Sequence, residues 1–362
     1  MKALARQNIL KINPYKPGKP ISEVKREHGL KNVIKLASNE NPLGASPKAT
    51  AAIRKALSSI NLYPDGNCFS LKEKLAVSLK INSNSITFGN GSNELIELIL
   101  KAFLNEGEEV LMSKPDFLIY KLATLQENGS PIEVPLKKFV CDLEAVREKI
   151  TKKTKIIFIA NPNNPIGTYV SKKNLENFIK KVPKNIIIVL DEAYFEFALE
   201  KDYPNGIDYV KFANVIVLRT FSKSYGLAGL RIGYAVTNAF FVDCLNKARQ
   251  PFNVNSLAQA GAEAALSDKD FLNKTVTMTQ EQKDYLYGKF EEMNLEYIKS
   301  ATNFILLNCK TKGELVFDKL LKKGIIVRDM KAYGLDEWIR VTVGKPSENQ
   351  KFIVALKKVL SV

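Results

Sequence analysis

The chain has 362 residues, of which 45% are hydrophobic, and this content excludes general disorder. The length is too great for one small core and fits one large domain with a smaller companion. No apolar run approaches the roughly 18 residues of a membrane helix, and the start of the chain lacks the apolar core of a signal peptide. We therefore expect a cytoplasmic protein that makes no membrane contact.

Lys and Arg total 54 against 38 acidic residues, a formal net charge of +16. The basic residues are scattered among apolar ones and no nucleic-acid-binding motif is visible, so we expect anionic small molecules and no nucleic acid as partners. The cysteines form no CxxC pair and His28 is the only histidine, so neither a disulfide framework nor a metal site is expected. The four distant cysteines are Cys68, Cys141, Cys244 and Cys309.

Helical patterns alternate with short, unbroken apolar runs over residues 47 to 266. Such runs are typical of strands buried on both faces of a mostly parallel sheet that is covered by helices. The predicted strands lie at 109–112, 156–160, 186–190, 215–218 and 232–235. This part of the chain is therefore predicted to be an α/β domain.

The two ends of the chain differ from this pattern. Residues 1–45 contain several prolines and are expected to be extended and associated with the small domain. The predicted large domain covers 46–267, and 268–362 is predicted to form a small α+β domain. Its expected elements are a long charged helix to about 293, a strand at 304–308, a helix at 314–323, strands at 325–327 and 339–343, and a final helix.

The segment from Val217 to Ala235 reads VLRTFSKSYGLAGLRIGYA and sets Lys223 between two hydroxyl residues. Position by position it resembles the cofactor-lysine segment of fold-type I pyridoxal-phosphate enzymes. The resemblance implies that Lys223 forms a Schiff base with pyridoxal 5′-phosphate and that Arg231 holds the cofactor phosphate. It also implies that Ser222 and Thr220 donate to this phosphate.

Asp191 ends the apolar run IIIVL, at the carboxyl edge of a predicted central strand, where open α/β sheets bind ligands. Pyridoxal phosphate acts as an electron sink only if its ring nitrogen stays protonated, which requires a carboxylate. We expect Asp191 to supply it, with Glu192 facing elsewhere. By resemblance, Tyr194 in the DEAYFEF segment hydrogen-bonds the phenolic oxygen of the cofactor.

Further segments match the same family. Asn161, at the start of NPNNPIGT, resembles the asparagine that bonds the phenolic oxygen, with a cis bond to the next proline. A Gly-rich turn runs into a helix in FGNGSNELIELIL and resembles the turn that cradles the phosphate, through Gly91, Ser92 and Asn93. Phe117 in KPDFLIY aligns with the aromatic residue that stacks on the pyridine ring.

Tyr63, in the LYPDG segment, resembles a tyrosine that reaches the cofactor phosphate of the neighbouring subunit. The active site would then be complete only in a homodimer. On the substrate side, Arg340 in WIRVTVG matches the arginine that binds the substrate carboxylate, a task that suits a planar guanidinium. Strand alternation places Arg340 and Thr342 on the same side.

The segments LASNENPLGASP, YPDG and GIIVRDM are similar to those of histidinol-phosphate aminotransferases. This likeness implies that Arg328 and Tyr15 hold the substrate phosphate and that Asn41 contacts the substrate. It also implies a fold-type I transferase with a large α/β domain and a small α+β domain.

The implied reaction is ping-pong transfer of an amino group between L-histidinol phosphate, a phosphorylated amino alcohol, and the 2-oxo acid 2-oxoglutarate. The amine of Lys223 would carry the proton from Cα to C4′. Three alternatives stay open: an aromatic amino-acid aminotransferase, a threonine-phosphate-type decarboxylase, and a catalytically idle cofactor-binding regulator. The regulator is disfavoured by Lys223 and by the lack of a spare segment for a DNA-binding domain.

Overall fold

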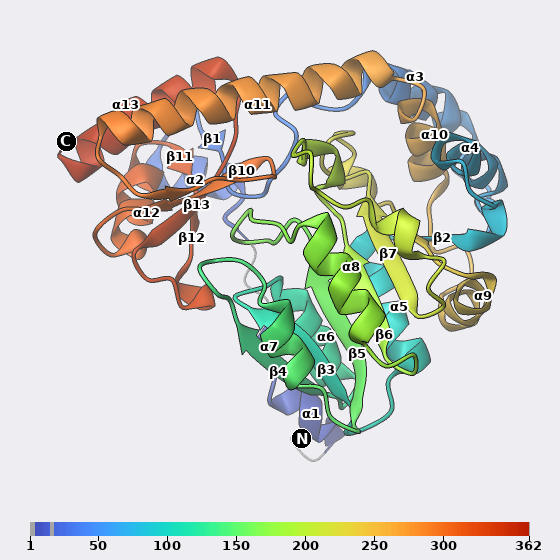
Figure 1. Cartoon of the computed structure of the whole chain (residues 1–362). Helices are drawn as coiled ribbons and strands as arrows, with labels where there is room; N and C mark the ends of the chain where they lie inside the picture. The colour runs from blue at the N-terminus through green and yellow to red at the C-terminus, as the bar shows by residue number, and fades with distance from the viewer. Residues whose placement is uncertain (1–3, 15–17, 362) are drawn as a thin grey trace.

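The protein is described by a computed structural model that covers residues 4–14 and 18–361 (Figure 1). Its main sheet has the strand order β2-β8-β7-β6-β5-β3-β4. The pairs from β4 through β7 are parallel, whereas β8 is antiparallel to both β7 and β2. The strands are β2 (Ile86–Gly89), β3 (Glu109–Lys114), β4 (Ser130–Pro135), β5 (Thr154–Ala160), β6 (Ile187–Asp191), β7 (Val215–Thr220) and β8 (Gly233–Val236). The predicted mostly parallel α/β sheet is confirmed.

Helices cover both faces of this sheet because its central strands are apolar on both sides. Ile188 and Leu190 of β6 pack into one core and Val189 into the other, since successive side chains of a strand point to opposite faces. One face is covered by α5 (Ser92–Phe103), α6 (Leu118–Gln126) and α9 (Ala239–Ala248). The opposite face is covered by α3 (Pro47–Ala56), α4 (Phe69–Leu79), α7 (Leu143–Glu148), α8 (Lys172–Lys181) and α10 (Ser256–Ala265).

A second, antiparallel sheet has the order β12-β13-β10-β9. Its strands are β9 (Tyr297–Ile298), β10 (Phe304–Asn308), β12 (Arg328–Asp329) and β13 (Trp338–Thr342). Its core is shared with α11 (Lys269–Glu292), α12 (Gly313–Lys322) and α13 (Pro346–Leu360). Helix α11 crosses the top of the view from near α3 to beside α13 (Figure 1). The α+β elements predicted after residue 268 are confirmed, whereas the domain boundaries stay predictions.

The N-terminal segment is more helical than its prolines suggest. It contains α1 (Gln7–Leu10) and α2 (Ile21–His28), so the expectation of an extended segment is wrong there. Pro20 caps α2 with a φ of −66°, and Gly29 ends it with a φ of 63°, which glycine adopts without strain. Strand β1 (Ile34–Lys35) then pairs in parallel with β11 (Ile325–Ile326).

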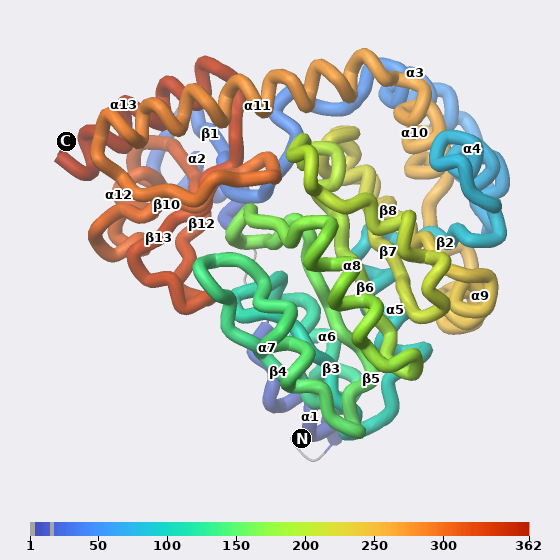
Figure 2. Tube along the Cα trace, viewed as in Figure 1, coloured from blue at the N-terminus to red at the C-terminus, as the bar shows by residue number. Residues whose placement is uncertain are grey.

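The first helix lies apart from the rest of this segment. Asn8 donates to the carbonyl of Leu125 at 2.9 Å, so α1 lies against α6 of the main sheet region. Figure 2 shows α1 at the bottom of the view, far from α2. The N-terminal segment thus contacts both sheet regions.

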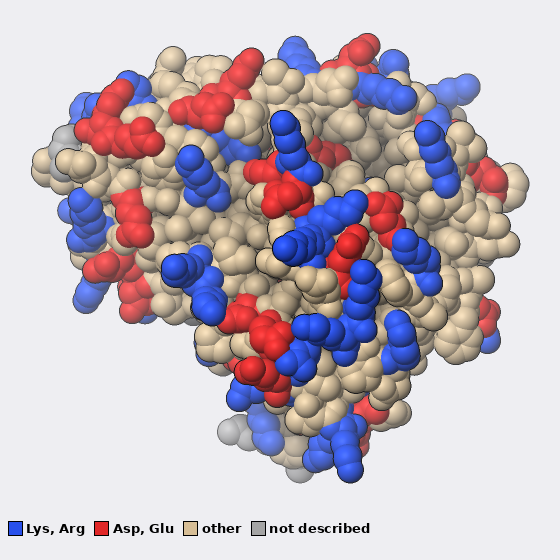
Figure 3. Space-filling model, in the orientation of Figure 1, with Lys and Arg blue, Asp and Glu red and all other residues tan. Residues whose placement is uncertain are grey.

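Short 3₁₀ turns connect several of these elements: η2 (Leu57–Ser59), η3 (Ser83–Ser85), η4 (Phe195–Phe197), η5 (Gly206–Tyr209), η6 (Ala228–Leu230) and η7 (Lys331–Tyr333). Within residues 4–14 and 18–361, no helix combines the length and the apolar character needed to cross a bilayer. Figure 3 shows Lys and Arg spread over the visible face and interspersed with Asp and Glu, as the scattered sequence pattern predicts.

Candidate active site

A cavity of about 260 Å³ lies at the carboxyl ends of β5, β6 and β7. Carboxyl ends of neighbouring parallel strands meet at one sheet edge, which is where open α/β sheets bind ligands. The cavity is lined by Ser38, Glu40, Ser92, Asn93, Phe117, Tyr120, Ala160, Pro162, Asn164, Asp191, Ala193, Tyr194, Thr220, Ser222, Lys223, Ala228 and Arg231. Most of the residues that the sequence predicted for the cofactor site are therefore brought together.

Lys223 follows β7 and directs its amine into this cavity. Among the described residues, its Nζ has one hydrogen-bond partner, the carbonyl of Ser38 at 3.4 Å. Burial lowers the pKa of Lys223 to about 8, and the positive charge of Arg340 acts in the same direction. Water still reaches part of the side chain. A lysine with this pKa is more readily a neutral nucleophile or base near pH 7 than an ordinary lysine.

Asp191 ends β6 and is almost fully buried. Its Oδ2 accepts a hydrogen bond of 2.7 Å from the hydroxyl of Tyr120, and its Oδ1 accepts one of 3.1 Å from the backbone N–H of Ala193. Burial raises the pKa of the Asp191 carboxyl, whereas these two donors and Lys223 act to lower it. Donors to the charged form thus limit the rise in pKa that burial causes.

The sequence analysis missed Tyr120. Its ring stacks on Phe158 at a centroid distance of 4.5 Å and meets Phe117 edge-on at 5.6 Å. In the sequence it has the spacing of an ordinary core residue of α6. Its place one helical turn after Phe117 is the one signal that it faces the same site.

Glu192 faces away from the cavity, as the alternation of an extended chain predicts. It forms a buried ion pair with Arg219, with an Nη2–Oε2 distance of 2.7 Å, and also accepts from the backbone N–H of Gly206. The guanidinium of Arg219 lies 3.4 Å from the ring centroid of Phe195. Adjacent carboxylates therefore have separate environments, and Asp191 alone faces the cavity.

Tyr194 is buried three residues after the end of β6 and lines the cavity. Its hydroxyl accepts a hydrogen bond of 2.8 Å from Nδ2 of Asn39, and its ring packs edge-on against Phe304. Burial raises the pKa of Tyr194 to about 12. The phenol therefore stays protonated over the range in which most enzymes work. Asn39 is a second residue that the sequence analysis missed.

One end of the cavity is built to hold an anion. Ser92 begins α5, whose first N–H groups have no helical acceptor, and Gly91 precedes it with a φ of 82°. A Cβ atom on Gly91 would lie 2.6 Å from Nη2 of Arg231, so only glycine lets the guanidinium approach this helix start. The hydroxyls of Thr220 and Ser222 lie 3.0 Å apart beside them.

Asn161 is not among the residues that line the cavity, although Ala160 and Pro162 on either side of it are. Its Oδ1 accepts from the N–H of Val170 at 2.7 Å, and one of the two hydrogens of its Nδ2 is donated to the carbonyl of Val170 at 3.3 Å. The Asn161–Pro162 bond is cis, as the resemblance implied. Asn164, three residues later, lines the cavity, and its Oδ1 accepts from Nη1 of Arg340 at 2.6 Å. The motif NPNNP offers several asparagines, and the sequence alone did not distinguish them.

Asn41 is not among the residues that line the cavity either. Its Nδ2 donates to the carbonyl of Ser224 at 2.9 Å and to Oγ1 of Thr275, while its Oδ1 accepts from the N–H of Leu43. The side chain thus ties the N-terminal segment to the residue after Lys223. Ser38 and Glu40 of the same segment line the cavity.

The predicted substrate arginines lie on neighbouring strands beyond the cavity lining. Arg340 is buried on β13, donates to the carbonyl of Ala37 at 2.9 Å, and lies 5.0 Å from the ring centroid of Phe304. Arg328 on β12 is the register partner of Arg340 and is half-buried. Tyr15 falls outside the described residues.

Tyr63 does not line the cavity. Its side chain is 84% exposed and stacks on Phe252 at a centroid distance of 4.9 Å. An exposed aromatic side chain of this size is available to contact another molecule.

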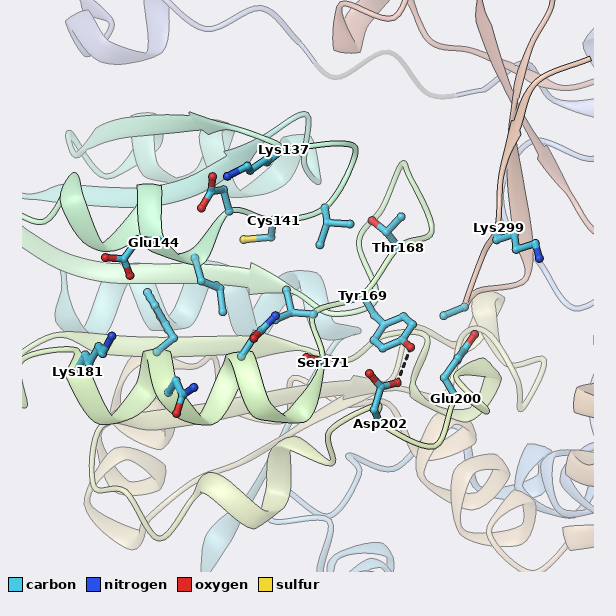
Figure 4. A pocket seen from close by; sticks show the side chains of 18 residues that line it. Lys137, Cys141, Glu144, Thr168, Tyr169, Ser171, Lys181, Glu200, Asp202 and Lys299 are labelled. Carbon is cyan, nitrogen blue, oxygen red and sulfur yellow. Dashed lines mark hydrogen bonds between the residues drawn. The ribbon is translucent and has the colours of Figure 1, made fainter.

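A larger hollow of about 840 Å³ lies beside α7 and α8 and holds none of the predicted site residues (Figure 4). Both lysine and carboxylate side chains line it. The hydroxyl of Tyr169 donates there to Oδ1 of Asp202 at 2.6 Å. The smaller cavity is the candidate site, because size alone supplies no chemistry and this hollow has no convergent reactive groups.

A model of the aminotransferase class I and II family matches residues 31–356. The chain belongs to this family. It is 49% identical over 356 residues to the histidinol-phosphate aminotransferase of Caldicellulosiruptor saccharolyticus, and the match covers 98% of this chain and 99% of that protein. It is 46% identical over 361 residues to histidinol-phosphate aminotransferase 2 of Carboxydothermus hydrogenoformans, covering 99% of this chain and 100% of that protein.

The fold comparison agrees with the sequence comparison. The crystal structure of histidinol-phosphate aminotransferase from Sinorhizobium meliloti in complex with pyridoxal-5′-phosphate has a TM-score of 0.91 with this chain. The two are 28% identical, and the match covers 98% of this chain and 97% of that one. The predicted fold-type I architecture of an aminotransferase is confirmed.

Proposed function

We propose that the protein is a pyridoxal-phosphate-dependent aminotransferase that acts on L-histidinol phosphate and 2-oxoglutarate in histidine biosynthesis. The observation that carries this proposal is the cavity in which Lys223, Asp191, Tyr194 and Arg231 converge. The names of the relatives at 46% and 49% identity support the same substrate.

The polar side chains that line the cavity fit both the phosphate and the ring of pyridoxal phosphate. The start of α5 with Ser92 and Asn93, the hydroxyls of Thr220 and Ser222, and the guanidinium of Arg231 would hold the phosphate. Gly91 supports this, since any side chain there would collide with Arg231. The face of Phe117 would cover the ring, as the sequence predicted.

Bound pyridoxal phosphate supplies an electron sink that weakens the bonds at the substrate α-carbon. Asp191 would hold a proton on the ring nitrogen, helped by the hydrogen bond that it accepts from Tyr120. Tyr194 would donate to the phenolic oxygen, as would Asn161 through the second hydrogen of its Nδ2. The amine of Lys223 would take the proton from the substrate Cα and return it at C4′ of the cofactor.

The substrate side of the proposal rests on two arginines. Arg340 would bind the carboxylate of the amino acceptor, and its contact with Asn164 would orient the guanidinium toward the cavity. Arg328, the register partner of Arg340 on the adjacent strand, would hold the phosphate of histidinol phosphate together with Tyr15. Asn41 is left out of this set because its amide is engaged elsewhere.

We further propose a homodimer in which Tyr63 reaches the cofactor phosphate of the neighbouring subunit. Its exposure on the single chain supports this role, because an 84% exposed tyrosine beside Phe252 is open to a second subunit. A cytoplasmic location and small-molecule partners complete the proposal.

The decisive experiment follows the visible absorption of the purified protein loaded with pyridoxal phosphate, in the absence of any oxo acid. Loss of the lysine-bound cofactor band at low L-histidinol phosphate, with no loss at equal L-phenylalanine, is the expected result. Preferential loss with phenylalanine would indicate an aromatic aminotransferase instead. Release of carbon dioxide from a phosphorylated amino acid would indicate a decarboxylase, and restoration of the band by 2-oxoglutarate would identify the acceptor.

A further inference from the structure

Asn39 joins three distant parts of the chain at the wall of the candidate site. Its side-chain Nδ2 donates to the hydroxyl of Tyr194 at 2.8 Å, and its carbonyl accepts from Nδ2 of Asn303 at 3.0 Å. Its backbone N–H donates to Oγ1 of Thr342 at 2.9 Å. The residue is 2% exposed, so these contacts are formed away from bulk water.

Thr342 determines the orientation of the Asn39 side-chain amide, that is, whether its oxygen or its nitrogen faces Tyr194. Because Oγ1 of Thr342 accepts the backbone N–H of Asn39, its own proton is free to donate to Oδ1 of Asn39, which lies 3.0 Å away. With Oδ1 held by Thr342, Nδ2 must face Tyr194. The amide therefore presents a donor, and not an acceptor, to the tyrosine hydroxyl.

A phenol has one proton, and the direction of that proton depends on its neighbours. Because the amide nitrogen Nδ2 of Asn39 is a donor and cannot accept a hydrogen bond, Tyr194 cannot donate to it. The hydroxyl proton of Tyr194 must therefore point elsewhere, and Tyr194 lines the cavity. The hydrogen bond accepted from Asn39 also polarises the phenol and strengthens it as a donor.

We propose that Asn39 is a positioning residue that directs the hydroxyl proton of Tyr194 into the cavity, toward the phenolic oxygen of the bound cofactor. This inference rests on the proposed function and adds to it a residue from the N-terminal segment. The backbone of Asn39 has a φ of 55°, a left-handed conformation that asparagine tolerates better than most residues. Both the side chain and the backbone thus call for asparagine at this position.

The test is a pH titration of the visible absorbance of the cofactor-loaded protein without substrate, which follows protonation of the nitrogen between Lys223 and the cofactor. A hydrogen bond from Tyr194 to the phenolic oxygen stabilises the deprotonated form and keeps the midpoint low. Asn39→Ala should raise the midpoint by about 0.5 to 1 pH unit. Asn39→Asp should raise it further, because an acceptor of the same shape draws the Tyr194 proton away from the cavity.

The decisive control is the Tyr194→Phe background. There, Asn39→Ala should produce no further shift if Asn39 acts through the hydroxyl, since a pairwise effect disappears with its partner. A shift of equal size in both backgrounds would overturn the inference, as would unshifted midpoints in both Asn39 variants when Tyr194→Phe alone shifts the midpoint. A wild-type protein that gives no lysine-bound cofactor band would instead overturn the proposed function.

A second pair of variants applies if the Asn39 variants do not fold. Thr342→Val keeps the shape of the side chain but removes the hydroxyl that orients the amide, so it should raise the midpoint. Thr342→Ser keeps the hydroxyl and should leave it unchanged. The opposite ranking of these two variants would contradict the proposed orientation.

Discussion

The hydroxyl of Tyr120 donates a hydrogen bond of 2.7 Å to Oδ2 of Asp191, and neither side chain has appreciable contact with water. The tyrosine is held in place by its stacking on Phe158. The bond opposes the effect of burial on Asp191, since burial favours the neutral acid and a donor favours the carboxylate. The charge state of Asp191 therefore depends on a residue of a neighbouring helix.

Tyr120→Phe tests this dependence while keeping the ring stack. Loss of the donor should raise the pKa of Asp191 further, and because the carboxylate is the required form, activity should fall as the pH decreases through that pKa. We expect kcat to fall about tenfold near pH 6 and less near pH 8, with the acidic limb of the profile moved to higher pH. An equal loss at every pH would indicate a structural effect instead.

Lys223→Ala should abolish amino transfer, because no other amine in the described cavity can carry the proton at the substrate Cα. Some pyridoxal phosphate should still bind through the phosphate end of the site, without the lysine-bound absorption band. Activity assays and equilibrium dialysis of the cofactor check the two parts separately. Lys173→Ala, an exposed lysine of α8, serves as the matched control and should behave as wild type.

Capture of the cofactor by the apoprotein should follow the lowered pKa of Lys223. The neutral amine is the nucleophile, so its fraction increases as the pH rises through the pKa of about 8. The rate of borohydride-trapped incorporation should therefore rise between pH 7 and 9 and level off above that range. A rate that continues to rise toward pH 10.5, the ordinary lysine value, would show that burial does not act on this amine.

Arg328→Ala should separate the proposed substrate from its rival. Loss of a charged hydrogen bond to the phosphate should lower kcat/KM for histidinol phosphate about 100-fold, whereas any turnover of phenylalanine should change little. Arg328→Lys should recover part of the loss, since it restores the charge without the planar guanidinium. Equal losses for both substrates would rule out the phosphate contact.

Glu192→Ala should destabilise the fold without acting at the cavity. It leaves the buried guanidinium of Arg219 without its carboxylate, which typically costs about 3 to 5 kcal/mol of unfolding free energy. Denaturant titration measures this change. Glu144→Ala removes an exposed ion pair with Arg147 and should leave the stability unchanged. Equal stability of the two variants would show that the buried pair contributes nothing.

Much of the fold and the site could be predicted because the signals are local. The apolar runs identify the central strands, and their unbroken apolar character indicates a mostly parallel sheet buried on both faces. Lys223, Asp191 and Tyr194 occur in segments whose residue types and spacing resemble a known cofactor site. Asp191 ends a strand, and Tyr194 and Lys223 each lie three residues beyond a strand end, so their place near the sheet edge follows from the sequence.

The errors and omissions concern polar side chains whose partners lie far away in the sequence. Asn39 meets Tyr194 across 155 residues, and Asn41 meets Thr275 across 234. Which asparagine faces a cavity and which one ties a loop depends on tertiary geometry that no local pattern encodes. Asn161 and Asn164 illustrate this. They lie three positions apart in one motif, yet the side chain of Asn161 bonds to the backbone of Val170 whereas Asn164 lines the cavity.

The position of β8 bears on how the protein matures during synthesis. Strand β2 pairs with β8 among the described strands, and β8 is formed by Gly233–Val236. The turn after β2 that leads into Ser92 can therefore reach its place beside Arg231 only after the ribosome has made the chain through residue 236. Cofactor capture should consequently be a late event, and a nascent chain that stalls earlier should be recognisable by its failure to bind pyridoxal phosphate.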